Sequence, residues 1–179
     1  GVKIAELCKS IKRSNEIILD SLKDLGNLDG VNSSYAVGPV FPMVFMSKVK
    51  LPGRELEDDM LWQLDESEMM KPEDYDTIIN KGWNSFKDDY LRNRLGLDVD
   101  ALEKDMAYCP QADENVKKAG YVVYSPAVVL TVNEYLGGGR SLSKFMMDLF
   151  RMPDKVEAVL EVIQKETMEG FRKQLRAIK

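Results

Sequence analysis

The sequence predicts an α/β fold in which long helices separate a few short strands. In several stretches apolar residues recur at three- and four-residue steps, which is the spacing of one helix face. Residues 121–124 (YVVY) have the β-branched and aromatic composition of a strand, which Pro126 limits. From these residues through three glycines to the last apolar stripe, the chain has the pattern of a strand, a loop and a helix. In parallel sheets, such loops carry binding groups at the strand ends.

Helix caps and stops divide the first half of the chain. A first helix is predicted over about residues 3–25, because Gly26 and Asn27 tolerate the left-handed conformation in which helices end. A second long helix is predicted from Pro72, a favoured first helical position. Between them, residues 35–47 are rich in Val, Phe and Met but contain two prolines, which predicts a short strand and an irregular extended piece. Residues 61–64 (LWQL) fit either a short strand or a loop anchor.

In the second half, a polar helix is predicted over roughly residues 98–118. The strand at residues 121–124 is expected to be buried, and the three glycines at 137–139 are expected to break the chain in a loop. Ser141 is expected to cap the next helix. Pro153 is expected to open the last helix, whose apolar face is formed by Val156, Leu160, Ile163 and Phe171.

The composition bounds the size and class of the protein. The chain has 179 residues and a mass of 20.3 kDa, enough for one ordinary domain. Its 25 Lys and Arg against 30 Asp and Glu give a net charge of −5, which argues against a nucleic-acid binder with a basic patch. No apolar run reaches the roughly 18 residues that suggest a membrane span, and the first residues lack the apolar block of a signal peptide. We therefore expect a cytoplasmic protein that binds neither nucleic acid nor membrane.

The absence of histidine restricts the chemistry that these residues can perform. It removes the Ser-His and Cys-His pairs of nucleophilic catalysis and the commonest zinc ligand. Cys8 and Cys109 fit neither a disulfide framework nor a four-thiolate zinc site, and Cys109 has no neighbouring base. The sequence therefore assigns no catalytic residue and no metal ligand.

Two charged motifs are candidates for binding. The segment from Gly137 through Arg140 to Ser141 (GGGRS) combines glycines that let N–H groups converge, a following helix N-terminus and a guanidinium that can hold an anion. The alternative is a flexible turn with a solvated arginine. An acidic stretch could hold a hard cation, but it lacks the spacing of a calcium loop, and a solvated face is the favoured interpretation. Its acids are Glu55, Glu57, Asp58, Asp59, Asp65, Glu66 and Glu68.

Two stretches resemble the uroporphyrinogen decarboxylase superfamily. Residues 130–160 (LTVNEYLGGGRSLSKFMMDLFRMPDKVEAVL) are similar to a run with a Tyr, a Gly-rich turn, a helix, a P-x-x-V step and a long helix. The version here is closer to the methyltransferase-like branch. Residues 51–66 and 72–83 resemble a segment of decarboxylase-like proteins that are linked to corrinoid methyl transfer.

The resemblance implies a (β/α)8 TIM barrel with its cleft at the C-terminal ends of the strands. Such barrels typically need about 250 residues. Residues 1–179 are therefore expected to be a single partial uroporphyrinogen decarboxylase-like domain, from the N-terminal and middle part of the barrel. The resemblance also implies that ligand-binding residues lie in the glycine segment. These are Asn133, Tyr135, Gly137, Gly138, Gly139 and Arg140.

The function implied by the resemblance is that of a fragment whose intact form is a corrinoid-linked methyltransferase. One alternative is uroporphyrinogen decarboxylase, a lyase of porphyrin and heme biosynthesis, although its active-site Tyr column is occupied here by Asn133. Another is a non-catalytic binding or interaction module. No cofactor is assigned to this chain, and zinc and a corrinoid are expected only for the intact methyltransferase. The expected partners are a small-molecule, tetrapyrrole or corrinoid ligand and a corrinoid protein.

Two expectations follow from an incomplete barrel. The chain alone is expected to be inactive, because catalytic residues of either reaction are missing. It is also expected to self-associate, because unpaired strand edges and apolar helix faces need cover, with Phe145, Met146 and residues 121–130 near the contact.

Overall fold

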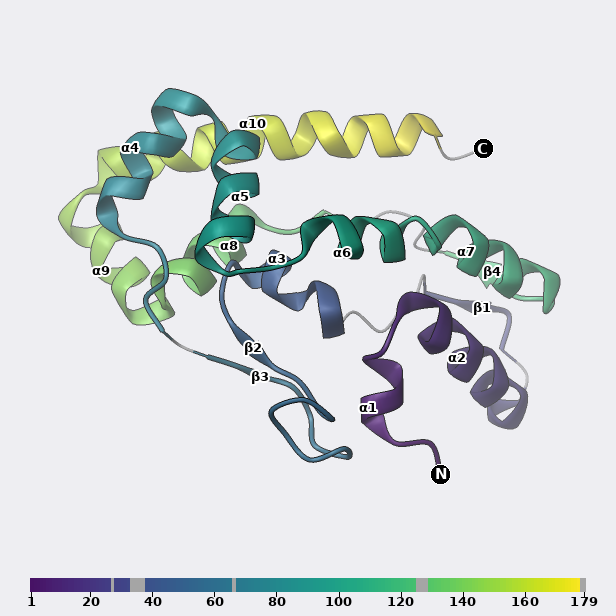
Figure 1. Ribbon diagram of the computed structural model, residues 1–179. Coiled ribbons are helices and arrows are strands. Elements are labelled where there is room, and N and C mark those ends of the chain that lie inside the picture. Colours follow the sequence, from purple (N-terminus) through teal and green to yellow (C-terminus); the bar gives the residue numbers. More distant parts are fainter. Residues whose placement is uncertain (27, 33–37, 66, 125–128, 178–179) are drawn as a thin grey trace. The chain divides into compact units, whose positions relative to one another are not determined.

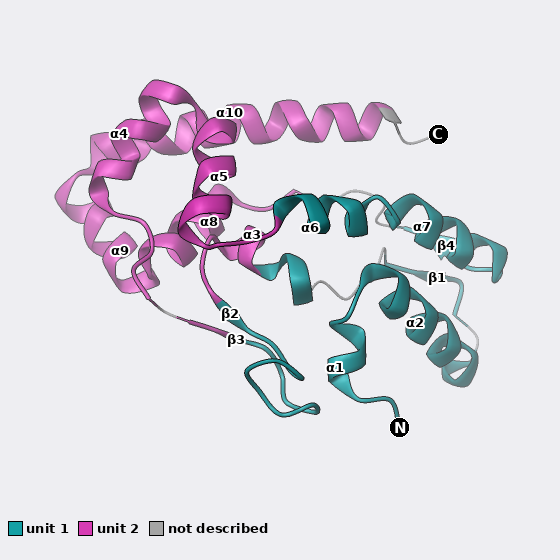
Figure 2. Ribbon diagram, viewed as in Figure 1, with its two compact units in different colours: residues 1–41, 49–63, 99–128 teal, residues 42–48, 64–98, 129–179 magenta. Residues whose placement is uncertain are grey.

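The structure is a computed structural model that describes residues 1–26, 28–32, 38–65, 67–124 and 129–177. The chain is mostly helical with a few short strands, which confirms a mixed α/β class (Figure 1). It divides into two compact units, coloured separately in Figure 2. Unit 1 comprises residues 1–41, 49–63 and 99–128, and unit 2 comprises residues 42–48, 64–98 and 129–179.

Unit 1 is built around a short parallel strand pair. Its elements are α1 (Ile4–Leu7), α2 (Ile11–Leu25), β1 (Gly30–Val31), η1 (Gly38–Val40), β2 (Val49–Lys50), α6 (Val99–Met106), α7 (Cys109–Lys118) and β4 (Val122–Val123). Strands β1 and β4 pair in parallel, with Gly30 opposite Val122. Leu22 of α2 and Val116 of α7 are buried together with Val31 of β1. Parallel pairing of strands far apart in the sequence is characteristic of an α/β fold.

The strand predicted at residues 121–124 forms only over Val122–Val123, and the prediction that it is buried is wrong. Val123 packs against the Leu22 cluster, whereas the exposed fractions of Val122 and Tyr124 are 64% and 67%. Because successive side chains of a strand point to opposite faces, one covered face leaves every second residue in solvent.

The helix predicted over residues 3–25 is two helices, because α2 has an N-cap of its own. Ser10 is extended, with φ at −166°, and its hydroxyl accepts a hydrogen bond from the Arg13 N–H at 3.1 Å. The Asp105 carboxylate also accepts from the Ile11 N–H at 3.0 Å. At the other end Gly26 has a φ of 85°, as its predicted role as a stop requires, while Asn27 lies outside the described residues. The polar helix predicted over residues 98–118 is likewise divided into α6 and α7.

Unit 2 is predominantly helical. Its elements are α4 (Pro72–Lys81), α5 (Trp83–Asp89), the π-helical turn η2 (Tyr90–Arg94), α8 (Val132–Arg140), α9 (Leu142–Arg151) and α10 (Pro153–Ala177). Two more elements, α3 (Phe41–Phe45) and β3 (Gln63–Leu64), have their first residue in unit 1 and their remaining residues in unit 2. Strand β3 pairs with β2, so the short strand that was one of two predictions for residues 61–64 is confirmed over Gln63–Leu64. The largest buried side chains of this unit are Trp83, Tyr75, Tyr90, Phe145, Met46, Met70, Ile78, Leu91 and Leu136.

The predicted helix starts in unit 2 are confirmed at two prolines. Helix α4 begins at Pro72 and α10 begins at Pro153, with Val156 and Ile163 of α10 buried. The long second helix breaks at Gly82, whose φ of 86° belongs to the left-handed region. A new helix, α5, starts directly after this glycine.

Two loop predictions are wrong. Residues 38–45, expected to be extended, form η1 and α3, because Pro39 and Pro42 lie at positions in short helical turns where no donor is needed. Residues 33–37 of the same prediction lie outside the described residues. The glycines at 137–139, expected to break the chain, lie inside α8. That helix is started by a capping box in which the Thr131 N–H donates to the Glu134 carboxylate at 3.2 Å.

Candidate functional site

A cavity of about 330 Å³ in unit 2 is the candidate functional site. It follows one side of α8 and reaches the start of α9. Its lining residues are Phe45, Leu64, Asn133, Glu134, Gly137, Gly138, Ser141 and Leu142. The cavity therefore contains three of the six residues predicted to bind a ligand, namely Asn133, Gly137 and Gly138.

The close packing of α8 against α3 beside the cavity depends on Gly138. A Cβ atom at this position would lie 1.8 Å from the Phe45 carbonyl oxygen, which is far too close for any side chain. Gly137 is different, because a Cβ there would make ordinary contacts of 3.8 Å and 3.9 Å with carbons of Leu142 and Phe145. Gly138 thus allows α8 to pack closely against α3, whereas position 137 has room for a Cβ atom.

Strained backbone lies beside the same cavity. Ser141 lines it with a φ of 67°, and Met46, next to Phe45, has a φ of 50°. Among the described residues these are the two non-glycine positions with positive φ. The Met46 carbonyl is held by a hydrogen bond of 2.7 Å from the buried Tyr90 hydroxyl. Strained residues of this kind cluster at functional sites, which supports the choice of this cavity.

The structure places Tyr135 in the core rather than in the cavity lining. Its ring lies 5.0 Å from that of Trp83, and the Lys87 ammonium lies 5.5 Å from its centroid. Burial raises the pKa of the Tyr135 phenol above its usual value. Burial also lowers the pKa of the Lys87 ammonium, whose contact with the Tyr135 ring is a cation–π contact.

Gly139 and Arg140 also face the interior. The Gly139 carbonyl accepts hydrogen bonds from the Met69 and Met70 N–H groups at 3.0 Å and 2.7 Å. Arg140 donates from Nε to Asp148 at 2.7 Å and from Nη2 to the same carboxylate at 3.2 Å. These interactions give Arg140 an internal role in place of the predicted contact with an external anion.

A charge-balanced cluster surrounds the Arg140 guanidinium. Nη1 donates to the Met70 carbonyl at 2.8 Å and also to Glu68, which pairs in turn with Lys144. Burial by itself would lower the pKa of Arg140, but its hydrogen bonds with Asp148 and Glu68 outweigh burial and raise that pKa. The Lys144 ammonium, followed by Arg140, lowers the pKa of Glu68.

Asp148 and Tyr75 complete this cluster and were not singled out from the sequence. The Tyr75 hydroxyl donates to Asp148 at 2.8 Å, and burial, followed by this hydrogen bond, raises the pKa of the phenol. Asp148 follows Arg140 by eight residues, but Arg140 ends α8 and Asp148 lies in α9, so no spacing within one helix could have identified the pair from the sequence.

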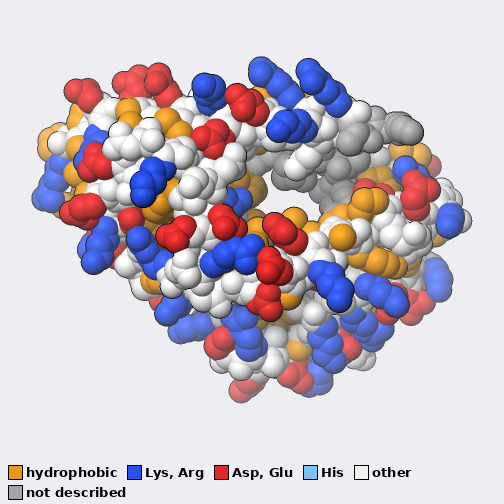
Figure 3. Space-filling model, turned by 45° about the horizontal axis from the view of Figure 1, so that its top comes forward, with side chains coloured by type: hydrophobic (Ala, Val, Ile, Leu, Met, Phe, Trp, Pro, Cys, Tyr) orange, Lys and Arg blue, Asp and Glu red, His pale blue; other side chains and the backbone are white. Residues whose placement is uncertain are grey.

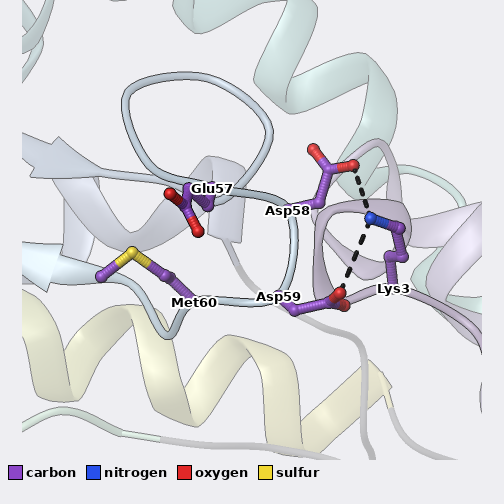
Figure 4. Close-up of a pocket in the computed structure, with 5 residues that line it drawn as sticks. All are labelled: Lys3, Glu57, Asp58, Asp59 and Met60. Carbon is purple, nitrogen blue, oxygen red and sulfur yellow. Dashed lines mark ion pairs between the residues drawn. The ribbon is translucent and has the colours of Figure 1, made fainter.

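Three acids of the acidic stretch, Glu57, Asp58 and Asp59, line a second cavity of about 500 Å³ in unit 1 together with Lys3 and Met60 (Figure 4). The Lys3 ammonium lies between Asp58 and Asp59, at 3.2 Å and 3.6 Å from their carboxylate oxygens. Glu55 pairs with Arg54 at 2.6 Å. Glu66 lies outside the described residues, and in the part of the chain that the structure describes no three His, Cys, Asp or Glu side chains are grouped to hold a metal ion.

The two cysteines are free thiols. Burial raises the pKa of Cys8, and burial together with nearby Asp113 and Asp105 raises the pKa of Cys109 to about 11. A raised pKa disfavours the thiolate that nucleophiles and zinc ligands require.

The surface shows no gathering of one charge sign on the face in Figure 3, where the Lys and Arg side chains are interspersed with Asp and Glu over the described residues. Among the helices that the structure describes, none combines the length and the apolar character needed to cross a membrane.

Comparisons of the chain with protein-family models, with curated proteins and with solved structures found no match.

Proposed function

We propose that this chain is part of a uroporphyrinogen decarboxylase-like methyltransferase and contributes to a (β/α)8 barrel. In this proposal the α8 cavity receives the ligand group that carries or accepts the methyl group. The resemblance of residues 130–160 supports it, because the same residues form α8, α9 and the start of α10 and provide most of the cavity lining. The parallel pairing of β1 with β4 supports the barrel, which is built from parallel strands.

The charge of the residues that line the cavity favours methyl transfer over decarboxylation. Glu134 is the single ionisable residue among the described lining residues, and none of these is Arg or Lys. Uroporphyrinogen carries several carboxylates, and a site for them needs guanidinium or ammonium partners. The nearby Arg140 is engaged by Asp148 and Glu68. A neutral or cationic ligand group therefore suits this cavity better than a polycarboxylate does.

The size of the cavity also favours methyl transfer over decarboxylation. Its volume of about 330 Å³ is at the lower end of the roughly 300–1,000 Å³ of small-molecule sites. A tetrapyrrole macrocycle is too large to be enclosed there, whereas a methyl group and the atoms next to it can enter. A corrinoid would therefore dock at the mouth and insert only its methyl-bearing side.

Zinc finds no set of ligands among the described residues. In that part of the chain no three His, Cys, Asp or Glu side chains are grouped to hold a metal ion, and burial raises the pKa of both cysteine thiols. None of the described residues is therefore proposed as a zinc ligand.

Calorimetric titration of the chain with methylcobalamin and with uroporphyrin I tests the proposal. We expect methylcobalamin to bind at least about tenfold more tightly, a difference of about 1.4 kcal/mol. Tighter binding of uroporphyrin would overturn the methyl-transfer branch in favour of decarboxylation. If neither compound bound, the cavity would not be a ligand site, and the interaction-module alternative would be favoured.

Two glycine variants test whether methylcobalamin binds in the α8 cavity. Gly137→Leu fills the cavity from α8 and should abolish methylcobalamin binding. Gly170→Leu is the matched control, because Gly170 also lies inside a helix but a Cβ there meets nothing within 4 Å. Glu134→Gln tests the charge argument separately: it keeps an acceptor for the Thr131 N–H and should strengthen uroporphyrin binding. Equal binding by the two leucine variants would place the ligand elsewhere.

A further inference from the structure

Helix α9 has an apolar face that no described residue of its own unit, unit 2, covers. The residues of this face, with their exposed fractions, are Leu142 (57%), Met146 (51%), Met147 (45%), Leu149 (39%) and Phe150 (88%). Positions 142, 146, 149 and 150 follow the i, i+4, i+7, i+8 spacing of one helix stripe. The Phe145 side chain is buried and Met146 is exposed, and the expected proximity of both residues to a contact stays a prediction.

The size of this face suits an interface between two chains. With about 200 Å² for each fully exposed side chain of this size, the five residues expose roughly 550 Å². That is as large as the largest apolar patch of a typical monomer, which is about 300–600 Å². Two such faces together would bury about 1,100 Å², which approaches the lower limit of about 1,200 Å² for specific stable interfaces.

We propose that α9 mediates self-association of this chain, with two copies packing their α9 helices antiparallel across a two-fold axis at Met146. Leu142 and Phe150 each lie four residues from Met146, about 6 Å along the helix at 1.5 Å per residue. An antiparallel arrangement therefore brings Phe150 of one copy over Leu142 of the other. Such an interface is self-complementary, as two-fold symmetry requires.

The α8 cavity provides the pocket for the exposed aromatic ring. Leu142 lines its mouth together with Leu64 and Phe45, and the Phe150 side chain of the second copy would enter this apolar space. Each copy offers both a cavity and a projecting ring, so two insertions form at once. An anchor residue that fills a pocket is the usual energetic centre of an interface.

Charge complementarity favours a second copy of this chain as the occupant. Arg151 follows Phe150 and has no ion pair among the described residues, whereas Glu134 is an exposed carboxylate of the cavity lining. In the antiparallel arrangement, Arg151 of one copy approaches Glu134 of the other. The inference does not rest on the proposed methyl-transfer function, but it competes with it for the α8 cavity, because a chain whose cavity holds Phe150 of the second copy has no room there for the ligand group.

Sedimentation velocity of the chain at micromolar concentration tests the proposal. We expect a species of twice 20.3 kDa, which Phe150→Glu converts to a monomer. Leu175→Glu is the control, because Leu175 is an exposed apolar residue of α10 outside the α9 face, and this variant should remain dimeric. Since Phe150 is 88% exposed, its substitution should leave the helical circular dichroism spectrum unchanged, while the unfolding midpoint should fall because the stabilisation by dimerisation is lost. A monomeric parent chain, or a Phe150→Glu variant that stays dimeric, would overturn the proposal.

Disulfide trapping tests the two-fold geometry. In a background with Cys8→Ser and Cys109→Ser, Met146→Cys should form a disulfide-linked dimer on mild oxidation, because the axis passes this residue. A mixture of Leu142→Cys and Phe150→Cys chains should form the mixed dimer in preference to either homodimer. Leu175→Cys should remain unlinked. Linkage through residue 175 with none through residue 146 would show that another surface mediates association.

Discussion

Arg140 and Asp148 form a two-point ion pair that is almost completely removed from solvent inside unit 2. The exposed fractions of their side chains are 4% and 6%, and the Tyr75 hydroxyl adds a hydrogen bond to the same carboxylate. The pair joins the end of α8 to the middle of α9. It therefore holds together the two helices that carry most of the cavity lining and the exposed α9 face.

The first prediction is that breaking this pair is costly. Asp148→Ala leaves the Arg140 guanidinium buried with a reduced set of partners, which typically costs about 3–5 kcal/mol of unfolding free energy. Lys144→Ala removes only the half-exposed partner of Glu68 and should cost less than about 1 kcal/mol. Urea denaturation of the two variants measures the difference, and equal losses would contradict the importance given to the buried pair.

The second prediction is that the two neighbouring glycines Gly137 and Gly138 differ sharply in their tolerance of a side chain. Gly138→Ala should prevent stable folding, since its Cβ would lie 1.8 Å from the Phe45 carbonyl oxygen. Gly137→Ala should instead stabilise the chain by up to about 1 kcal/mol, as expected for replacing glycine inside a helix. Thermal melts of both variants, with Gly170→Ala as an open-space control, test this order. A folded Gly138→Ala variant as stable as the parent would show that α3 and α8 are not held so closely.

Prolines and glycines show which parts of the fold the sequence could predict and which it could not. Pro72, Pro153 and Gly26 mark helix boundaries through their own backbone chemistry, and those predictions are confirmed. The helical state of Gly138 depends on a close approach by Phe45, more than ninety residues earlier, and no local pattern announces it. The break at Ser10 was missed because the apolar spacing continues through it while Asp105 helps to cap the next helix.

The site was predicted in part for a similar reason. Asn133, Gly137 and Gly138 lie on one side of α8, so a prediction based on their segment brought three true lining residues together. Phe45 and Leu64 reach the cavity from other segments and leave no local signal. Arg140 was assigned to an external anion because a sequence shows the cation without showing that Asp148 already satisfies it.

The third prediction concerns Glu166, which caps a helix far from it in sequence. Its carboxylate oxygens accept from the Trp83 N–H at 3.1 Å and the Asn84 N–H at 2.8 Å, at the start of α5, where Gly82 has no side chain to do so. Glu166→Ala should therefore cost about 0.5–2 kcal/mol, the usual cost of losing an N-cap.

A matched control distinguishes this capping role from a general effect of charge on α10. Glu169→Ala removes an exposed acid three residues along the same helix, and its effect should lie within about 0.5 kcal/mol. Chemical denaturation of the two variants makes the comparison. A loss as large for Glu169→Ala as for Glu166→Ala would assign the effect to helix charge.

The last prediction is that stability falls as the pH rises above about 9. Cys109 has its pKa raised from 9.0 to about 11, and the pKa of the Tyr75 phenol is also raised, so both groups hold their protons more tightly when the chain is folded. The folded state then binds more protons than the unfolded state above pH 9, and linkage makes the free energy of unfolding decrease with pH. The contribution from Cys109 is fully present below its unfolded pKa and is lost by about pH 11.

Denaturation midpoints measured from pH 8 to pH 11 should decline for the parent chain and decline less for Cys109→Ser and for Tyr75→Phe. Parallel declines in all three proteins would show that neither burial site is linked to folding.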